Sequence, residues 1–200
     1  MSTPANFVPM GVTRFSQYNA PKESSCSAKQ ATAYVFTGAG DCTYNYGVTL
    51  SAQFMSQTVI NATGRSTQFG LIKPFNNTGL IRFCNYPDGG NQGNTFVQVS
   101  KIAGSCNTEF KDGTSLAVNP NPHTDTTGTW NCGDQVALVS TNNTLDSVRI
   151  VQDACGRCKR VSDFNGANGH IDVYTTEDAC RPTAIFDYNS PATYYGIRLR

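Results

Sequence analysis

Eight cysteines spread along 200 residues constrain the fold of this chain more than any other feature of its sequence. An even number of cysteines beside only two histidines favours disulfides formed in an oxidising compartment. Zinc is the alternative, but a structural zinc site usually uses two CxxC or Cys/His pairs, and this sequence has one CxxC. We therefore predict a disulfide-braced fold without a metal, with bonds formed by Cys26, Cys42, Cys84, Cys106, Cys132, Cys155, Cys158 and Cys180.

The low charge of the chain limits its partners. Charged residues make up 14% of the sequence and the formal net charge is +1, which gives no electrostatic reason to expect nucleic acid or an anionic membrane. Polarity comes from Asn, Thr, Ser, Gln and Gly, and such a surface suits neutral glycans as well as secreted β-proteins in general. No apolar run approaches the ~20 residues that a membrane helix needs.

Two further features indicate a secreted protein. Sequons at Asn61, Asn76 and Asn142 lie in polar, turn-like segments and predict N-glycosylation. The opening residues MSTPANFVPMG lack the apolar core of a signal peptide, which indicates a mature chain whose targeting segment has been removed. We expect an extracellular monomer that uses no cofactor.

Short apolar segments bounded by turn residues predict an all-β first half, with no convincing amphipathic helix. Its opening is irregular, with at most a short strand around Val12 and Phe15. The loop-like segment PDGGNQGN, residues 87–94, places a domain boundary at about residue 92. We expect strands in this β-rich region, 1–92, at residues 31–37, 46–55, 67–75 and 79–84.

The second half, 93–200, shows six short strand patterns and at most a helical turn or two at 176–182. The strands are expected at residues 95–100, 115–120, 135–140, 147–152, 170–175 and 194–200. Residues 141–146 join two of them as a hairpin. Six short strands without the regular hairpins of a sandwich favour a small closed barrel.

The number of cysteines on each side of the expected boundary carries a consequence. Three precede residue 92 and five follow it. If all eight are paired, at least one disulfide must join the two halves of the sequence. This arrangement predicts a rigidly joined pair rather than two domains on a free linker.

The stretch VRIVQDACGRCKRVSDFNGANGHIDVYT, residues 148–175, is the strongest candidate for a functional site. It places Asp153 and Asp172 at two strand edges, with a cysteine-braced polar loop between them. The alternative for Asp172 is that it accepts backbone N–H groups within the loop. For Asp153 the alternative is that it braces the loop or pairs with Arg149 or Arg157. The CGRC pair suits a structural disulfide better than a redox site, because no βαβ pattern surrounds it.

The order IAGSC, DGTSLAVNP, NCGDQVALV, VRIVQDACGRC, GHIDVYT and YYGIRLR resembles the six-stranded double-psi β-barrel. That fold is shared by expansins, barwin-like proteins, rare-lipoprotein-A-like proteins and family-45 cellulases, and lytic transglycosylases are relatives. The resemblance covers about residues 93–200 and leaves the first half unassigned. It implies an all-β chain whose C-terminal half is a double-psi barrel.

The resemblance implies roles for two residues, and this sequence departs from the family pattern at two other places. HIDVY resembles the family segment whose carboxylate is the general acid of the cellulases, which would be Asp172 here. VQDAC makes Asp153 the second carboxylate of the cleft. Asn119 in LAVNP stands where three-aspartate domains carry an Asp, and is therefore a departure. The expected first strand, TFVQVS, also lacks the second carboxylate of an inverting hydrolase, since it offers only Gln98 and Ser100. A single-acid or non-hydrolytic mechanism stays open.

Several further side chains are candidates for contacts with a glycan. His170 could hydrogen-bond a ligand or cap its strand, and Asn119 would be its neighbour. Trp130, Tyr44, Tyr174 and Tyr188 are candidates for stacking on sugar rings, with core packing as the alternative for each. Trp130 is the preferred one, because it lies in the long polar loop 121–133.

These observations lead to two functional hypotheses. The first is a secreted, expansin-like protein that binds or remodels cell-wall polysaccharide. If it is an enzyme, it is a glycosidase or a lytic transglycosylase. The second is a barwin-like defence protein or protease inhibitor that uses the barrel as a scaffold and acts through exposed loops such as 120–131. Its partner would then be a target protease.

Overall fold

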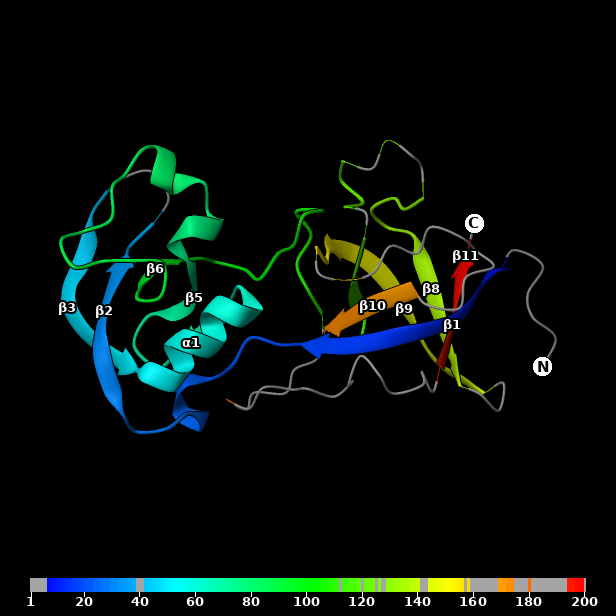
Figure 1. The fold of residues 1–200 in the computed structure, drawn as a ribbon, viewed down its shortest axis with the longest axis horizontal. Coiled ribbons are helices and arrows are strands. Elements are labelled where there is room, and N and C mark those ends of the chain that lie inside the picture. The colour runs from blue at the N-terminus through cyan, green and yellow to red at the C-terminus, as the bar shows by residue number, and fades with distance from the viewer. Residues whose placement is uncertain are drawn as a thin grey trace. The chain divides into compact units, whose positions relative to one another are not determined.

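The computed structural model divides the chain into two compact units, each described here by itself (Figure 1). The barrel unit comprises Met1–Tyr18, Ala103–Thr175 and Thr183–Arg200, and the inserted unit comprises Asn19–Ile102 and Thr176–Pro182. The structure describes residues 7–38, 42–111, 113–119, 121–124, 126, 129–140, 144–156, 158, 169–174, 180 and 194–199.

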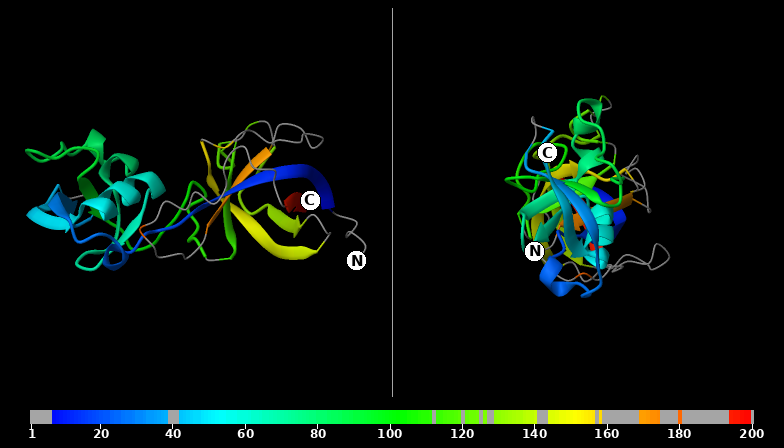
Figure 2. Two further views of the ribbon diagram at one scale, coloured as in Figure 1. Left: turned by 60° about the horizontal axis from the view of Figure 1, so that its bottom comes forward. Right: turned by 90° about the vertical axis from the view of Figure 1, so that its left-hand side faces the viewer.

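Six strands of the barrel unit form a closed barrel in the order β1-β10-β7-β9-β8-β11. Figure 1 shows β1 beside β10, and Figure 2 gives two further views of the same strands. The bounds are β1 Phe7–Tyr18, β7 Ser115–Val118, β8 Gln135–Ser140, β9 Leu145–Ala154, β10 Gly169–Tyr174 and β11 Tyr194–Leu199. The closed six-stranded barrel is therefore confirmed, as is the hairpin joining β8 to β9.

The connectivity of this barrel has an internal twofold symmetry. If β1 is exchanged with β9, β7 with β10 and β8 with β11, every strand keeps the same kind of neighbours in the barrel. The directions also match: the parallel pair β1–β10 maps onto the parallel pair β7–β9. The antiparallel pair β1–β11 likewise maps onto β8–β9. Two interlocked halves of this kind make a double-psi barrel.

The first strand of the barrel was predicted wrongly. Thr95–Gln98 forms β6 of the inserted unit, whereas β1 comes from the opening of the chain that the sequence pattern left irregular. Pro9 and Gly11 interrupt the strand pattern there, and the register of β1 against β11 shifts between Pro9 and Val12. A bulge accommodates a residue that cannot donate to the ladder, so β1 still runs for 12 residues.

The expected boundary near residue 92 is likewise corrected. The inserted unit separates β1 from β7, and the chain returns to the barrel unit only at Ala103. The segment 87–94 belongs to the inserted unit, where its backbone bonds close a local turn, as from Gly90 N to the carbonyl of Pro87 at 2.6 Å.

The interior of the barrel is filled by alternate residues of its strands. Leu116 and Val118 of β7 and Ile171 and Val173 of β10 belong to one buried cluster. Trp130 lies in the same cluster and is 1% exposed. Its expected role in sugar stacking is therefore wrong: the ring fills the core of the barrel.

The inserted unit is a five-stranded sheet with one α-helix. Its sheet order is β3-β2-β6-β5-β4. Val35 and Phe96 pack on one face with α1, while Phe36 and Val97 pack on the other face. The elements are η1 Glu23–Ser25, β2 Gln30–Phe36, β3 Tyr44–Ser51, α1 Ala52–Asn61, β4 Gly64–Ser66, β5 Gly70–Pro74, η2 Phe75–Asn77, η3 Leu80–Arg82 and β6 Thr95–Gln98.

Two expectations for this region were wrong. The strand expected over 46–55 ends at Ser51, whose hydroxyl accepts a bond from Phe54 N at 3.3 Å and caps helix α1. Phe54 and Met55 are buried against the sheet, so tertiary packing supports a helix whose sequence pattern is weak. The strand expected over 79–84 is a short 3₁₀ helix, η3.

Four disulfides join all eight cysteines, as predicted. Cys106–Cys132 and Cys155–Cys158 lie in the barrel unit, and Cys42–Cys84 lies in the inserted unit. The fourth, Cys26–Cys180, joins residues on either side of position 92.

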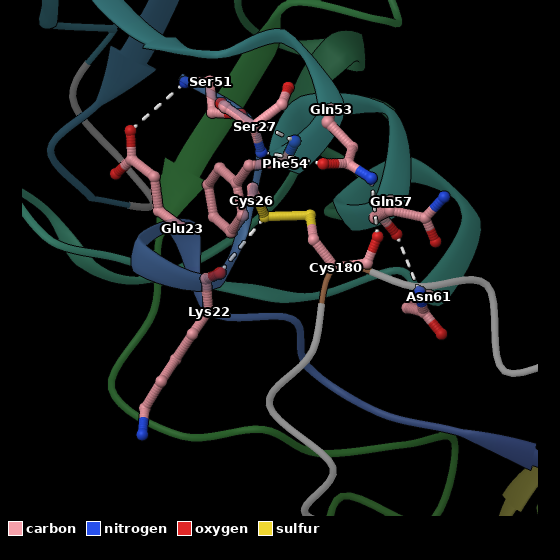
Figure 3. The surroundings of a disulfide bond; sticks show 10 residues. All are labelled: Lys22, Glu23, Cys26, Ser27, Ser51, Gln53, Phe54, Gln57, Asn61 and Cys180. Carbon is pink, nitrogen blue, oxygen red and sulfur yellow. Dashed lines mark hydrogen bonds between the residues drawn. A yellow bond between two sulfur atoms is a disulfide. The ribbon is translucent and has the colours of Figure 1, made fainter. Parts of the chain in front are cut away.

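Cys180 belongs to the inserted unit, although it lies between β10 and β11 in the sequence. Figure 3 shows its disulfide to Cys26 beside α1. Its side chain lies in the cluster packed on α1, and its carbonyl accepts a bond from Gln53 Nε2 at 2.9 Å. The disulfide therefore fixes Cys180 within the inserted unit. The other residues of the helical turn expected at 176–182 lie outside the described part of the chain.

Candidate active site

Two acidic side chains lie at the same level of the barrel wall. Asp172 of β10 pairs with Ala117 of β7, and Ala117 pairs with Asp153 of β9. Their neighbours Ile171 and Leu116 point into the core, so Asp172 and Ala117 face outward, because side chains alternate along a strand. Neighbouring strands lie about 4.8 Å apart, which separates the two aspartate backbones by roughly 10 Å.

Asp153 is held by the loop that begins the second barrel segment. Its Oδ1 accepts a hydrogen bond from Ser105 N at 2.8 Å. A Cβ placed on Gly104 would lie 2.4 Å from Asp153 Cγ, so only glycine fits there without a shift. Cys106 N also donates to the carbonyl of Gln152, at 3.2 Å. The bracing role considered for Asp153 is thus observed.

The loop held by Asp153 leads to a cluster of three aromatic rings. Tyr18 contacts Phe110 at 5.7 Å and Tyr174 at 5.3 Å between ring centroids, and Phe110 contacts Tyr174 at 5.3 Å. Tyr174 is 3% exposed. Its expected stacking on a sugar ring is therefore corrected to a packing role beside the two aspartates.

Tyr18 brings a hydroxyl group close to both carboxylates. Burial, followed by the negative charges of Asp153 and Asp172, raises the pKa of this hydroxyl well above the ordinary tyrosine value of 10.0. The positive charge of Arg149 lowers the pKa of the Tyr18 hydroxyl, but by less. The buried hydroxyl makes no hydrogen bond within the described part of the chain. It therefore stays protonated at neutral pH as a donor beside the two acids.

Arg149 completes the charged part of the site. Its Nη1 donates to the carbonyl of Tyr174 at 3.0 Å, which fixes the guanidinium at the end of β10. Sequence reasoning named Arg149 only as a partner of Asp153 and missed Tyr18 and Phe110 entirely. No local pattern marks Tyr18, because the parallel pairing of β1 with β10 is what places it opposite Tyr174.

Asn119 lies at the end of β7, where its amide secures the loop that contains the short disulfide. Its Nδ2 donates to the carbonyl of Cys158 at 2.6 Å, and Cys155 N donates to the carbonyl of Val118 at 2.8 Å. An ionised Asp at this position would place two acceptors against each other. The departure from the three-aspartate pattern thus has a local structural reason.

His170 lies on β10 two residues before Asp172 and is 4% exposed. The strand thus brings His170, Asp172 and Tyr174 onto one outward face. Tyr188 and Arg157 lie outside the described part of the chain. In the ranges that the structure describes, no group of three or more His, Cys, Asp or Glu side chains could hold a metal ion.

The sequons differ in their surroundings. Asn61 ends α1, and its Nδ2 donates to the carbonyl of Gln57 at 2.9 Å, so its amide is engaged in the fold. Asn76 lies in η2 with a buried Oδ1. Asn142 is outside the described residues. No helix in the described ranges combines the length and apolarity needed to cross a membrane.

No family model and no curated protein matches the chain. Among solved structures, MltA from E. coli with bound chitohexaose aligns with a TM-score of 0.53 and 11% identity, over 100% of this chain and 73% of that chain. Another E. coli MltA structure gives 0.49 and 10%, over 100% and 73%. The lytic transglycosylase LtgG of Burkholderia pseudomallei gives 0.47 and 12%, over 96% and 72%. At such low identity the likeness to the first structure establishes a shared fold.

Proposed function

We propose that this chain is a secreted enzyme that cleaves a cell-wall glycan by a lytic, single-acid mechanism, with Asp172 as the catalytic acid. The observation that carries the proposal is the arrangement on the barrel wall. Asp172 and Asp153 lie at one level, and Asp153 is engaged by Ser105 and Gly104. Asp153 thus has a structural task, and the resemblance of HIDVY to the segment that carries the general acid of the cellulases favours Asp172 for the chemistry.

The composition of β1, the strand that pairs with β10 beside Asp172, supports a mechanism with one acid. Ser16 of β1 pairs with Asp172, and β1, FVPMGVTRFSQY, contains no Asp or Glu. The first strand of the barrel therefore lacks a carboxylate, as was expected for TFVQVS, although the strand is β1. An inverting hydrolase needs a second carboxyl that activates water across the sugar, and β1 does not supply one.

The proposed reaction uses a single proton-transfer group twice. Protonated Asp172 donates its proton to the glycosidic oxygen, and the bond from that oxygen to the anomeric carbon breaks. A hydroxyl of the same sugar then attacks the anomeric carbon, and its proton returns to Asp172. Water is not consumed, and the new end is an intramolecular anhydro ring.

The substrate class follows from the fold neighbour together with the composition. The MltA structure with the highest TM-score quoted above holds chitohexaose, a polymer of N-acetylated sugars. A chain rich in Asn, Thr and Ser with a net charge of +1 suits such a neutral ligand. Four disulfides support an oxidising, extracytoplasmic location. The alternative is that the protein loosens the wall without cleaving the glycan, as expansins do.

The test compares Asp172→Asn with Asp153→Asn on peptidoglycan and on chitohexaose. Asn cannot donate the required proton, so we expect Asp172→Asn to lower release of fragments by about 10²- to 10⁴-fold in a protein that still folds. Asp153→Asn should instead lower the melting temperature, because it weakens the bond to Ser105. Fragment release that survives Asp172→Asn would refute the assignment, and binding without release by the wild type would favour the expansin-like alternative.

A further inference from the structure

The inserted unit carries a cluster of three tyrosines on β2 and β3. Tyr44 and Tyr46 are stacked at 5.7 Å with 27° between their planes. Tyr34 meets both edge-on, at 6.1 Å from Tyr44 and 5.9 Å from Tyr46. Tyr46 is 70% exposed. The ring of Tyr46 is thus packed against two other rings and still offers a flat apolar surface to solvent. We call the cluster of Tyr34, Tyr44 and Tyr46 the tyrosine platform.

The platform rests on a packed aromatic base. Tyr44 contacts Phe36 at 5.2 Å, and Phe36 stacks on Phe75 at 4.7 Å with 16° between the planes. Phe36 and Phe75 are buried in the core on that face of the sheet. The Cys42–Cys84 disulfide joins the segment before β3 to the segment after η3. Tyr44 and Tyr46 are thus fixed in orientation before any ligand arrives.

A polar loop with its own internal bonds borders the platform. The Tyr34 hydroxyl lies 2.8 Å from where a Cβ on Gly89 would stand, which places the 87–94 loop against this ring. The side chain of Asn94 accepts from Asn91 N at 2.7 Å and donates to the carbonyl of Gly89 at 3.2 Å. This loop therefore holds exposed Asp88 in a defined position.

Asp88 of the 87–94 loop interacts electrostatically with the tyrosine platform. Burial raises the pKa of the Tyr44 hydroxyl, and its proximity to the Tyr46 hydroxyl and to the Asp88 carboxylate raises that pKa further. Asp88 is exposed and follows Pro87 directly. A carboxylate acceptor on the 87–94 loop therefore lies near the stacked rings of Tyr44 and Tyr46 and their hydroxyl groups. This combination suits a ligand with an apolar ring face and hydroxyl groups at its rim.

We propose that the tyrosine platform, formed by Tyr34, Tyr44 and Tyr46 with Asp88 beside it, is a second glycan-binding surface, separate from the Asp172 site. One pyranose ring of a neutral polymer would lie on Tyr46, with its C–H face on the phenol and its hydroxyl groups toward Asp88. The choice of a glycan rests on the function proposed above. The surface would hold the polymer while Asp172 cleaves it.

The test measures binding of the full chain to insoluble chitin and peptidoglycan, together with cleavage of soluble chitohexaose. One stacking contact is worth about 0.5–1.5 kcal/mol. We therefore expect Tyr46→Ala to weaken polymer binding about three- to tenfold without changing the rate on chitohexaose. Tyr46→Phe keeps the ring and should bind like the wild type. Ile60→Ala is the matched control, because Ile60 is 60% exposed on α1.

Amide chemical shifts locate the binding site independently of any cleavage. On addition of chitohexaose, the expected changes include Tyr44–Gly47 and Asp88–Gly89. Polymer binding that is equal for Tyr46→Ala and wild type, or shifts confined to the barrel unit, would overturn the platform. So would a wild type that binds no glycan. If the platform binds and nothing is cleaved, the proposed function fails alone.

Discussion

The two units of this chain build their surfaces in different ways. In the barrel unit, the site joins Tyr18, Ala117, Asp153 and Asp172 from four strands, and strand register alone brings them together. In the inserted unit, the tyrosine platform comes from two sequential strands and one nearby loop. The first arrangement depends on closure of the barrel, whereas the second depends on local stacking.

The disulfides follow the same division. Those of the barrel unit span 3 and 26 residues, whereas those of the inserted unit span 42 and 154 residues. In the chain-entropy account, a cross-link that closes a longer loop restricts the unfolded chain more. The sheet of the barrel unit is closed and has no free edge, whereas the five-stranded sheet of the inserted unit is open. The open five-stranded sheet therefore depends more on covalent bonds between distant segments.

The largest effect expected from this difference is the loss of the Cys26–Cys180 bond. Replacing both cysteines by serine removes up to about 5 kcal/mol of stabilisation, against about 2 kcal/mol for the pair Cys155 and Cys158. Trp130 is the only tryptophan and lies in the barrel core, so its fluorescence reports on the barrel unit. Amide exchange in α1 and β2 reports on the inserted unit.

The Cys26→Ser, Cys180→Ser variant should lose amide protection in α1 and β2 while the denaturation midpoint of Trp130 moves less. The matched control is the variant with serine at Cys155 and Cys158. If the two double variants lose equal protection in α1, the proposed difference between the units is wrong.

A smaller effect is expected at Gly104, where the barrel site depends on close contact. An added Cβ would lie 2.4–2.5 Å from three atoms of Asp153, so Gly104→Ala must displace the loop or the carboxylate. We expect a loss of about 1–3 kcal/mol, measured by Trp130 fluorescence in a denaturant titration. Gly156→Ala is the control, because nothing lies within 4 Å of its Cβ position. Equal stability of the two variants would show that Asp153 does not brace the loop.

The smallest effect at neutral pH is expected at Tyr18. Its pKa is raised in the folded state, so the folded protein retains this proton at a pH where the unfolded chain releases it. This contribution to stability is fully present below the ordinary tyrosine pKa of about 10 and is lost as the pH rises through the folded-state pKa. Tyr18→Phe should lessen the alkaline fall in the unfolding free energy, followed by denaturation between pH 8 and 11. An unchanged alkaline slope would contradict the placement of Tyr18 beside two carboxylates.

The difference between the two units also explains which elements and which site residues could be predicted from the sequence. The strands from Ser115 onward were predicted well, because each is a short apolar run bounded by turn residues. Asp153 and Asp172 were predicted as a pair from the segments around them, and the strand register places them at one level of the barrel wall. Tyr18 was not predicted, since its neighbours arise from parallel pairing between the two ends of the chain.

The inserted unit was harder to predict for other physical reasons. Helix α1 is stabilised by packing of Phe54 and Met55 rather than by a clear periodic pattern. The barrel unit offers a parallel case, because Trp130 lies in a polar segment, yet its ring fills the core of the barrel. The segment 87–94 is rich in Gly and Asn like a linker, but internal side-chain bonds make it an ordered loop. Composition alone does not distinguish these outcomes.

The most direct test of the central claim is the chemical identity of the released glycan ends. Peptidoglycan and chitohexaose are incubated with the full chain in water labelled with heavy oxygen, and the fragments are analysed by mass spectrometry. A single-acid lytic mechanism at Asp172 predicts fragments lighter than hydrolysis products by one water molecule, without label at the new end, and predicts their loss in Asp172→Asn. Labelled reducing ends, or fragments that persist in Asp172→Asn, would contradict it.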